Sequence, residues 1–108
     1  MSVVAFVDDL MDRSRITSAI EGVRYQRTIA VDAVSDLEVK IVIVDLLKHA
    51  GSVVAIRAHY PAARVIGFAP HVDAASTNAV LMGVDVAVPR SRFFRDITAV
   101  MQQALLHD

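Results

Sequence analysis

Two apolar stretches of the chain each stop on aspartate. Residues 3–7, VVAFV, lead into Asp8 and Asp9, and residues 41–44, IVIV, lead into Asp45. Carboxylates that lie close together raise each other's pKa unless a cation lies among them, and oxygen-only ligands suit Mg²⁺ or another hard divalent ion. We therefore expect an acidic corner with weak affinity for Mg²⁺ if these segments are neighbours. Each aspartate alone also fits a simpler role, as a helix N-cap or as the polar end of a strand.

Two histidines and one arginine are further candidates. His49 follows Asp45 by four residues and could reach the same corner as a metal ligand or proton carrier, although a solvated loop histidine is the more common situation. His71 lies in a loop, where we favour an exposed residue. Arg90 begins a small basic cluster that is typical of a solvated face, and it is the best candidate to bind an anion or to pair with Asp45. No nucleophile–base pair, Gly-rich phosphate loop or metal-ligand spacing of histidines occurs, so we do not expect an enzyme.

Apolar runs and helix signals alternate along the chain. Strands are predicted at residues 3–7, 28–31, 40–44, 64–68 and 84–88. Helices are predicted within residues 8–22, 52–61, 73–83 and 91–106, the first closing on Gly22 and the last with an apolar stripe of Phe94, Ile97, Met101 and Leu105. Three of the strand runs are nearly continuous in apolar residues, as in strands buried on both faces. The alternation therefore predicts an α/β fold with a parallel sheet between two helical layers.

One crossover is too short for an ordinary helix. Only residues 32–39 separate the second and third predicted strands, whereas a parallel crossover usually needs a dozen or more residues. The second helix is therefore a single turn or missing. Its loss should uncover apolar surface near Val31, Ala33 and Val34, and exposed apolar patches usually mark partner sites. We expect a homodimer, and this surface is one candidate for its interface.

Composition limits the class of protein. The 108 residues are 55% hydrophobic, enough for one core, so we expect a single domain over residues 1–108. The chain has no cysteine, no signal peptide and no apolar run long enough to span a bilayer, so we expect a cytoplasmic protein without a membrane segment. The net charge of −1, without a basic run, argues against direct nucleic-acid binding.

Several of these segments resemble one known family. The stretches VDDLMDRSRI, IVIVDL, VIGFAPH and GVDVAVPRSRFF are similar, in order and spacing, to bacterial response-regulator receiver domains, and the resemblance covers essentially the whole chain. It implies a flavodoxin-like (CheY-like) doubly wound sheet of five parallel strands in the order 2-1-3-4-5, with the first and last helices on one face. It also implies that Asp8 and Asp9 are the Mg²⁺-binding pair, that Asp45 is the phospho-acceptor, and that the Leu47 carbonyl is a further metal ligand. Its partners would be a histidine kinase or an output domain, and the last helix and fifth strand would be the competing surface for a homodimer.

The chain departs from this family at the residues that respond to phosphorylation in receiver domains. The switch Thr or Ser falls on Ala69, the switch aromatic residue on Ala87, the lysine on Arg90 and the proline after it on Ser91. Alanine offers neither a hydroxyl for a phosphoryl oxygen nor a ring to rotate, and a planar guanidinium does not replace an ammonium. The resemblance therefore indicates a pseudo-receiver that acts by protein–protein contact without phosphorylation switching. A divergent receiver phosphorylated on Asp45 and a small-ligand or metal-binding α/β domain are the alternatives.

Overall fold

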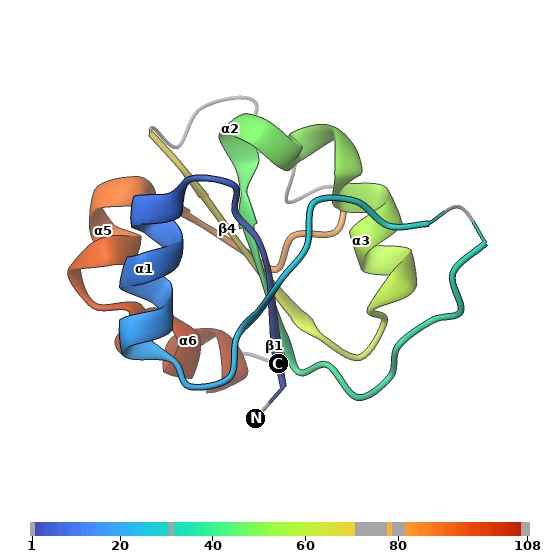
Figure 1. Cartoon of the computed structure of the whole chain (residues 1–108), viewed down its shortest axis with the longest axis horizontal. Helices are drawn as coiled ribbons and strands as arrows, with labels where there is room; N and C mark the ends of the chain where they lie inside the picture. The colour runs from blue at the N-terminus through green and yellow to red at the C-terminus, as the bar shows by residue number, and fades with distance from the viewer. Residues whose placement is uncertain (1, 31, 71–77, 79–81, 107–108) are drawn as a thin grey trace.

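Five parallel strands form the centre of the molecule. The computed structural model describes residues 2–30, 32–70, 78 and 82–106. The strands are β1 (Val3–Phe6), β2 (Arg24–Tyr25), β3 (Ile41–Asp45), β4 (Arg64–Ala69) and β5 (Val86–Pro89). They pair in the order β2-β1-β3-β4-β5, and every pair is parallel. This confirms the predicted sheet and places the carboxyl ends of all strands at one edge, the upper edge in Figure 1.

Helices cover both faces of the sheet. One face carries α1 (Leu10–Ala19), α5 (Arg90–Arg95) and α6 (Ile97–Leu106), and the other carries α2 (Leu46–His49), a 3₁₀ turn (Ala50–Ser52) and α3 (Val53–His59). The first and last helices thus share a face, as predicted. Residues of β1, β3 and β4 alternate between two apolar cores, one beneath each helical layer. All residues of β1 and β3 are buried, which explains why these strands read as continuous apolar runs.

The second strand lies earlier in the chain than the sequence indicated. Residues 28–30 form no strand, and β2 begins at Arg24, directly after the turn at Gly22, whose φ is 77°. Tyr25 holds this position because its hydroxyl donates to the carbonyl of Arg13 on α1, at 2.8 Å. Ile29, from the predicted strand, packs on the core beneath α3 instead. The predicted strand at 28–31 was therefore wrong, because the turn at Gly22 and the hydrogen bond of Tyr25 to α1 place the strand at residues 24–25, despite the β-branched residues that follow.

Two predicted helix ends also need correction. The segment at 91–106 is two helices, because Asp96 leaves the helical conformation with φ −154° and ψ 84° and accepts the N–H of Ala99 at 3.0 Å. An aspartate at this position starts a new helix as its N-cap, so the predicted single stripe is interrupted, and Leu105 is 37% exposed. The first helix ends at Ala19 with Ile20 as its C-cap, so Gly22 belongs to the following turn and is not the C′ residue.

A connector without a helix joins β2 to β3. Residues 32–40 contain no helix, which confirms the predicted loss of the second helix. Figure 1 shows the chain crossing in front of the sheet before residue 31, and residues 32–40 then running around the outer side of α3. The backbone N–H of Asp36 donates to the carbonyl of His59 at 2.7 Å, and the Ser35 hydroxyl donates to that of Ala58 at 3.3 Å. Val34 is 86% exposed, as the missing helix led us to expect.

Two further findings complete the fold. The helix predicted at residues 73–83 falls mostly outside the described residues, and so do Val31 and His71. In the part of the chain that the structure describes, no helix is both long and apolar enough to cross a membrane.

Candidate functional site

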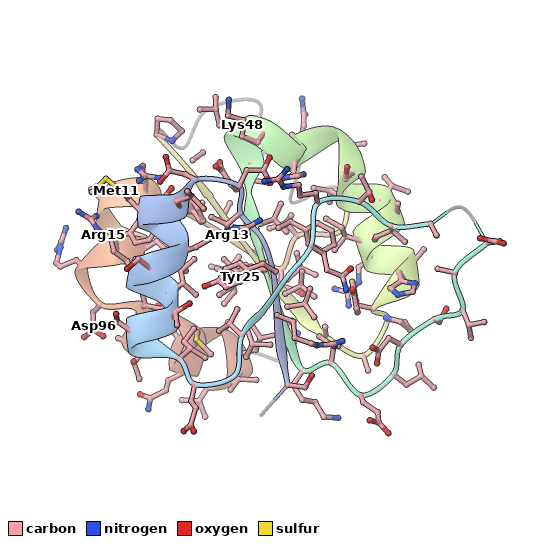
Figure 2. The ribbon with its side chains drawn as sticks, in the orientation of Figure 1. Met11, Arg13, Arg15, Tyr25, Lys48 and Asp96 are labelled. Atoms are coloured by element: carbon pink, nitrogen blue, oxygen red, sulfur yellow. The ribbon has the colours of Figure 1, made fainter. Side chains whose placement is uncertain are left out.

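A pocket opens at the carboxyl edge of the sheet, beside the central strand. It has a volume of about 250 Å³ and is lined by Asp9, Asp12, Asp45, Leu47, Lys48, Phe68, Pro70 and Arg90. Figure 2 shows Met11 at the start of α1 and Lys48 on α2, both at this edge. Three carboxylates and two basic side chains therefore meet where parallel α/β folds bind their ligands.

Asp45 is the buried acid at the tip of β3. It is 7% exposed, and its Oδ1 accepts the N–H of Leu47 at 3.0 Å, so that it caps the short helix α2. The helix lies tightly on β4, because a Cβ at Gly67 would come within 2.6 Å of Leu46. Burial raises the pKa of Asp45, and the bond from Leu47 opposes this rise only in part. The second carboxylate oxygen has no hydrogen bond with the described residues and is free to meet a ligand.

Asp8 and Asp9 take different roles. Asp9 caps α1, because its Oδ1 accepts the N–H of Asp12 at 3.0 Å. Asp8 turns to His49, whose Nε2 lies 3.0 Å from Asp8 Oδ1, and this hydrogen bond lowers the pKa of Asp8. Asp9 and Asp45 thus line one pocket, whereas Asp8 is held beside it.

His49 is not the solvated loop residue that its position suggested. It is 8% exposed, lies at the end of α2 and meets the ring of Phe6 edge-on at a centroid distance of 5.9 Å. The spacing from Asp45 is the signal in the sequence, since one helical turn returns the side chain to the same edge. No pattern in the sequence indicates that a helix begins directly at Leu46.

Arg90 pairs with Asp12, a residue that the sequence analysis did not single out. Nη1 of Arg90 donates to Oδ2 of Asp12 at 2.7 Å, and Nη2 donates to Oδ1 of the same carboxylate. Asp12 is 2% exposed, and its hydrogen bond raises the pKa of Arg90. The guanidinium also lies 4.7 Å from the ring centroid of Phe94 and 5.7 Å from that of Phe68. Arg90 therefore pairs with Asp12 and makes no hydrogen bond with Asp45, which corrects one of our predictions.

The position of Asp12 could have been inferred from spacing. Asp12 follows Asp9 by three residues and precedes Ile16 by four, so it lies on the buried face of α1 and at the same end as the cap. A carboxylate on a buried helix face needs a partner, and Arg90 supplies it from the start of α5.

Ala69 and Ala87, which the resemblance assigns to the two switch positions, lie at the end of β4 and within β5. Ala69 is buried at the end of β4 and is paired with Pro89, and Ala87 is half-buried in β5, paired with Gly67. Ala69 is next to the pocket through Pro70. Neither side chain can donate a hydrogen bond into the pocket.

The acidic residues are not gathered as a ready metal site. Within residues 2–30, 32–70, 78 and 82–106, no group of three histidine, aspartate or glutamate side chains is arranged to hold a metal ion. Mg²⁺ demands a near-octahedral oxygen shell, and two carboxylates with one oxygen each committed to a backbone N–H do not provide it. Weak binding of Mg²⁺ at this corner stays a prediction.

Comparison with known proteins bears on the fold. No protein-family model matches the chain, and no curated protein matches it significantly. Among solved structures, it is similar to a response regulator from Thermotoga maritima, with a TM-score of 0.72 and 15% sequence identity over 99% of each chain. Together with the strand order, this similarity shows that the chain has the fold of a response-regulator receiver domain.

Proposed function

We propose that the chain is a receiver-like signalling domain of the cytoplasm that acts through protein–protein contact and does not use phosphorylation as its switch. The observation that supports this proposal most strongly is the pairing of Arg90 with Asp12. The basic residue at the position of the receiver lysine already has a buried carboxylate as its partner, so it does not wait for a phosphoryl group on Asp45.

The chemistry of phosphoryl transfer explains the weight of this pair. Transfer to a carboxylate depends on positive charge and donors placed around the phosphoryl oxygens. To take part, Arg90 would have to leave Asp12 and expose an unpaired acid in a buried position. The neighbouring Ala69 offers no hydroxyl to bond a phosphoryl oxygen. Ala87 offers no aromatic ring that could rotate when such a bond forms. Both the stabilisation of a phosphoryl group and the transmission of its presence are therefore weakened.

Apolar side chains near the pocket favour a protein partner. Leu10 and Met11 at the start of α1 are 75% and 72% exposed, and Leu47 on α2 is 68% exposed. Three large apolar side chains exposed at one edge of a small domain fit the core of a protein interface better than they fit free solvent. We propose that a kinase or an output domain contacts this edge, and that the domain catalyses no reaction of its own.

A divergent phospho-accepting receiver is the second candidate. It is favoured by Asp45 itself, which lies in an open pocket with one carboxylate oxygen free of hydrogen bonds from the described residues. Lys48 also lines this pocket and brings a second positive charge. Under this alternative, Lys48 supplies the positive charge beside the phosphoryl group, because Arg90 is paired with Asp12.

The two candidates differ in their response to a phosphodonor. The protein is incubated with Mg²⁺ and either acetyl phosphate or beryllofluoride, and intact mass and amide NMR shifts are recorded. We expect no stable adduct and no shifts in β4 and β5. Asp45→Asn is the matched control, because asparagine keeps the cap on Leu47 and removes the nucleophile. A mass gain that disappears in Asp45→Asn, with shifts spreading through β4 and β5, would establish the phospho-accepting receiver instead.

A further inference from the structure

One carboxylate oxygen in the pocket at the carboxyl edge of the sheet has no partner. Asp45 is 7% exposed, and among the described residues only its Oδ1 is hydrogen-bonded, by the N–H of Leu47. Within the described part of the chain, no side-chain oxygen is both shut off from solvent and without a hydrogen bond, so the second oxygen of Asp45 is reachable from the pocket. A buried acid with an accessible, unbonded oxygen is a place for a donor.

The charges around this oxygen sum to a negative value. Asp12 and Arg90 pair with each other, so their charges cancel. The pocket lining then retains Asp9 and Asp45 against Lys48. Lys48 is exposed and makes no ion pair with the described residues, so its flexible stem can turn toward water without leaving an acid unpaired. A positively charged group is therefore favoured at Asp45.

The geometry at Asp45 favours an organic ammonium over a metal ion or a guanidinium. Mg²⁺ demands a near-octahedral shell of oxygens, which the described side chains do not provide. A guanidinium binds best when it donates to both oxygens of one carboxylate, as Arg90 does with Asp12, and one oxygen of Asp45 is already taken. An ammonium is a compact charge that can donate to a single oxygen and leave its other N–H groups to water.

The walls of this pocket suit an aliphatic stem. Leu47, Phe68 and Pro70 line it, and Leu47 is 68% exposed at its rim. Leu10 and Met11 are exposed at the same edge, at the start of α1 (Figure 2). The stem of a lysine covers apolar surface while its charged head reaches a polar group. The volume of about 250 Å³ is below the usual 300–1,000 Å³ of small-molecule sites, so the pocket fits one side chain better than a free ligand.

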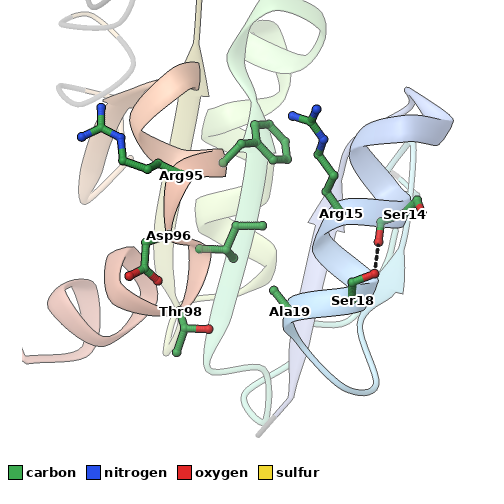
Figure 3. A pocket seen from close by; sticks show the side chains of 9 residues that line it. Ser14, Arg15, Ser18, Ala19, Arg95, Asp96 and Thr98 are labelled. Carbon is green, nitrogen blue, oxygen red and sulfur yellow. Dashed lines mark hydrogen bonds between the residues drawn. The ribbon is translucent and has the colours of Figure 1, made fainter.

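The larger pocket between α1 and the break at Asp96 offers no comparable acceptor. It has a volume of about 510 Å³, and Figure 3 shows Arg95 pointing away from Arg15. Asp96 is the one acid of its lining, and this exposed side chain already accepts the N–H of Ala99. The charged groups there do not face a common point, so the pocket of Asp45 is the better-built site.

We propose that the pocket of Asp45 receives a lysine side chain of the protein partner, with the ammonium on the second oxygen of Asp45 and the stem against Leu47. This inference rests on the proposed function, which places a protein partner at this edge. It adds the chemistry of that partner, which presents a lysine between apolar residues: the lysine meets Asp45, and its neighbours meet Leu10 and Met11. Apolar contacts around one charge pair exclude water and strengthen the pair.

A blocked tripeptide with lysine between two leucines is the probe, titrated into the whole chain and followed by amide NMR shifts. We expect saturable shifts at Leu47 and Phe68. The same peptide with glutamine in place of lysine should bind about tenfold more weakly, because one charge-assisted hydrogen bond becomes neutral. n-Butylammonium, which is the lysine side chain alone, should bind more weakly than the lysine peptide because it lacks the leucines.

Two substitutions should change the affinity for the lysine peptide in opposite directions. Asp45→Asn keeps the cap on Leu47 and removes the negative charge, so it should weaken binding about tenfold. Lys48→Gln removes the competing positive charge of the lining, so it should strengthen binding about twofold. Lys40→Gln is the matched control, because Lys40 is an exposed lysine before β3 that lies outside the pocket, and the affinity should not change.

Several results would overturn the inference. Equal affinity for the lysine and glutamine peptides, or an unchanged affinity in Asp45→Asn, would show that no ammonium binds at Asp45. Butylammonium that binds as tightly as the lysine peptide would identify a site for free amines, and tighter binding of a glutamate peptide would indicate an acidic partner. An adduct of acetyl phosphate on Asp45 refutes the proposed function itself, whereas a chain that forms no adduct and binds no lysine peptide refutes only the lysine contact.

Discussion

Removal of the Arg90 guanidinium leaves the carboxylate of Asp12 buried without its counter-ion. Asp12 is 2% exposed, whereas the side chain of Arg90 is 39% exposed. Breaking a fully buried pair by deleting one partner costs about 3–5 kcal/mol, and because this pocket opens to water we expect about 3 kcal/mol for Arg90→Met. Methionine keeps the apolar stem beside Phe94 and Phe68, so the change isolates the charge.

The reverse substitution should cost less. In Asp12→Asn the freed guanidinium can turn toward water, and the loss reduces to about 1 kcal/mol for one charge-assisted contact. The double variant Asp12→Asn/Arg90→Met has no charge left at either position of the pair. We therefore expect it to be more stable than Arg90→Met alone, with a coupling free energy of about 2 kcal/mol.

Urea unfolding followed by circular dichroism at neutral pH measures all four proteins of this cycle. Arg92→Met is the matched control, because Arg92 lies on the same helix and, among the described residues, bonds only the exposed Gln103. It should change the unfolding free energy by less than about 0.5 kcal/mol. A coupling free energy near zero would refute the reasoning. Arg90 would then be available to Asp45, and the proposal of a dismantled relay would lose its main support.

Three other predictions concern the same corner and the assembly. Burial raises the pKa of Asp45, so the ionised carboxylate is less favourable in the native state than in the unfolded chain, and the stability falls as the pH rises from the pKa of the unfolded state to that of the folded state. Asp45→Asn should therefore increase the free energy of unfolding by about 1 kcal/mol at about pH 7 and leave it unchanged near pH 3. Urea unfolding measured across this pH range tests the prediction. His49→Leu should release the Asp8 carboxylate and raise the affinity for Mg²⁺ about threefold to tenfold, as measured by a titration of amide shifts. An unchanged affinity would show that Asp8 is not a Mg²⁺ ligand. The chain should sediment as a homodimer at high micromolar concentration. Val34→Glu should shift it to the monomer if the connector side is the interface. A monomeric unsubstituted chain at that concentration would contradict dimerisation.

The sheet could be predicted because its signal is local and repeated. A strand that is buried on both faces must be apolar throughout, so β1, β3 and β4 are visible in the sequence, and the alternation with helices determines that they are parallel. β2 has two residues, one of them exposed, and it depends on the hydroxyl of Tyr25 reaching α1. No periodicity in a single sequence reports a contact of that kind.

The site was predicted only where a residue marks the end of a strand. Asp9 and Asp45 follow directly from the ends of β1 and β3, whose register places them at one edge. The partners of the acids depend on helices whose exact start sets the direction of each side chain. Helix α2 begins immediately after Asp45 and turns His49 inward, and α5 begins at Arg90 and brings it to Asp12. A shift of one residue in either helix start would rotate these side chains by about 100°.

The hydrogen bond of Asp8 and the ion pair of Asp12 give the acidic corner a different physical character from a set of carboxylates without partners. Asp8 is hydrogen-bonded to His49 and Asp12 is paired with Arg90, so two of the four carboxylates at this edge already have side-chain partners. A ligand that bound these carboxylates instead would first have to displace those partners, and its binding would be reduced by that cost. Under the proposed function, a protein partner recognises the surface around Leu10, Met11 and Leu47 in one constant state.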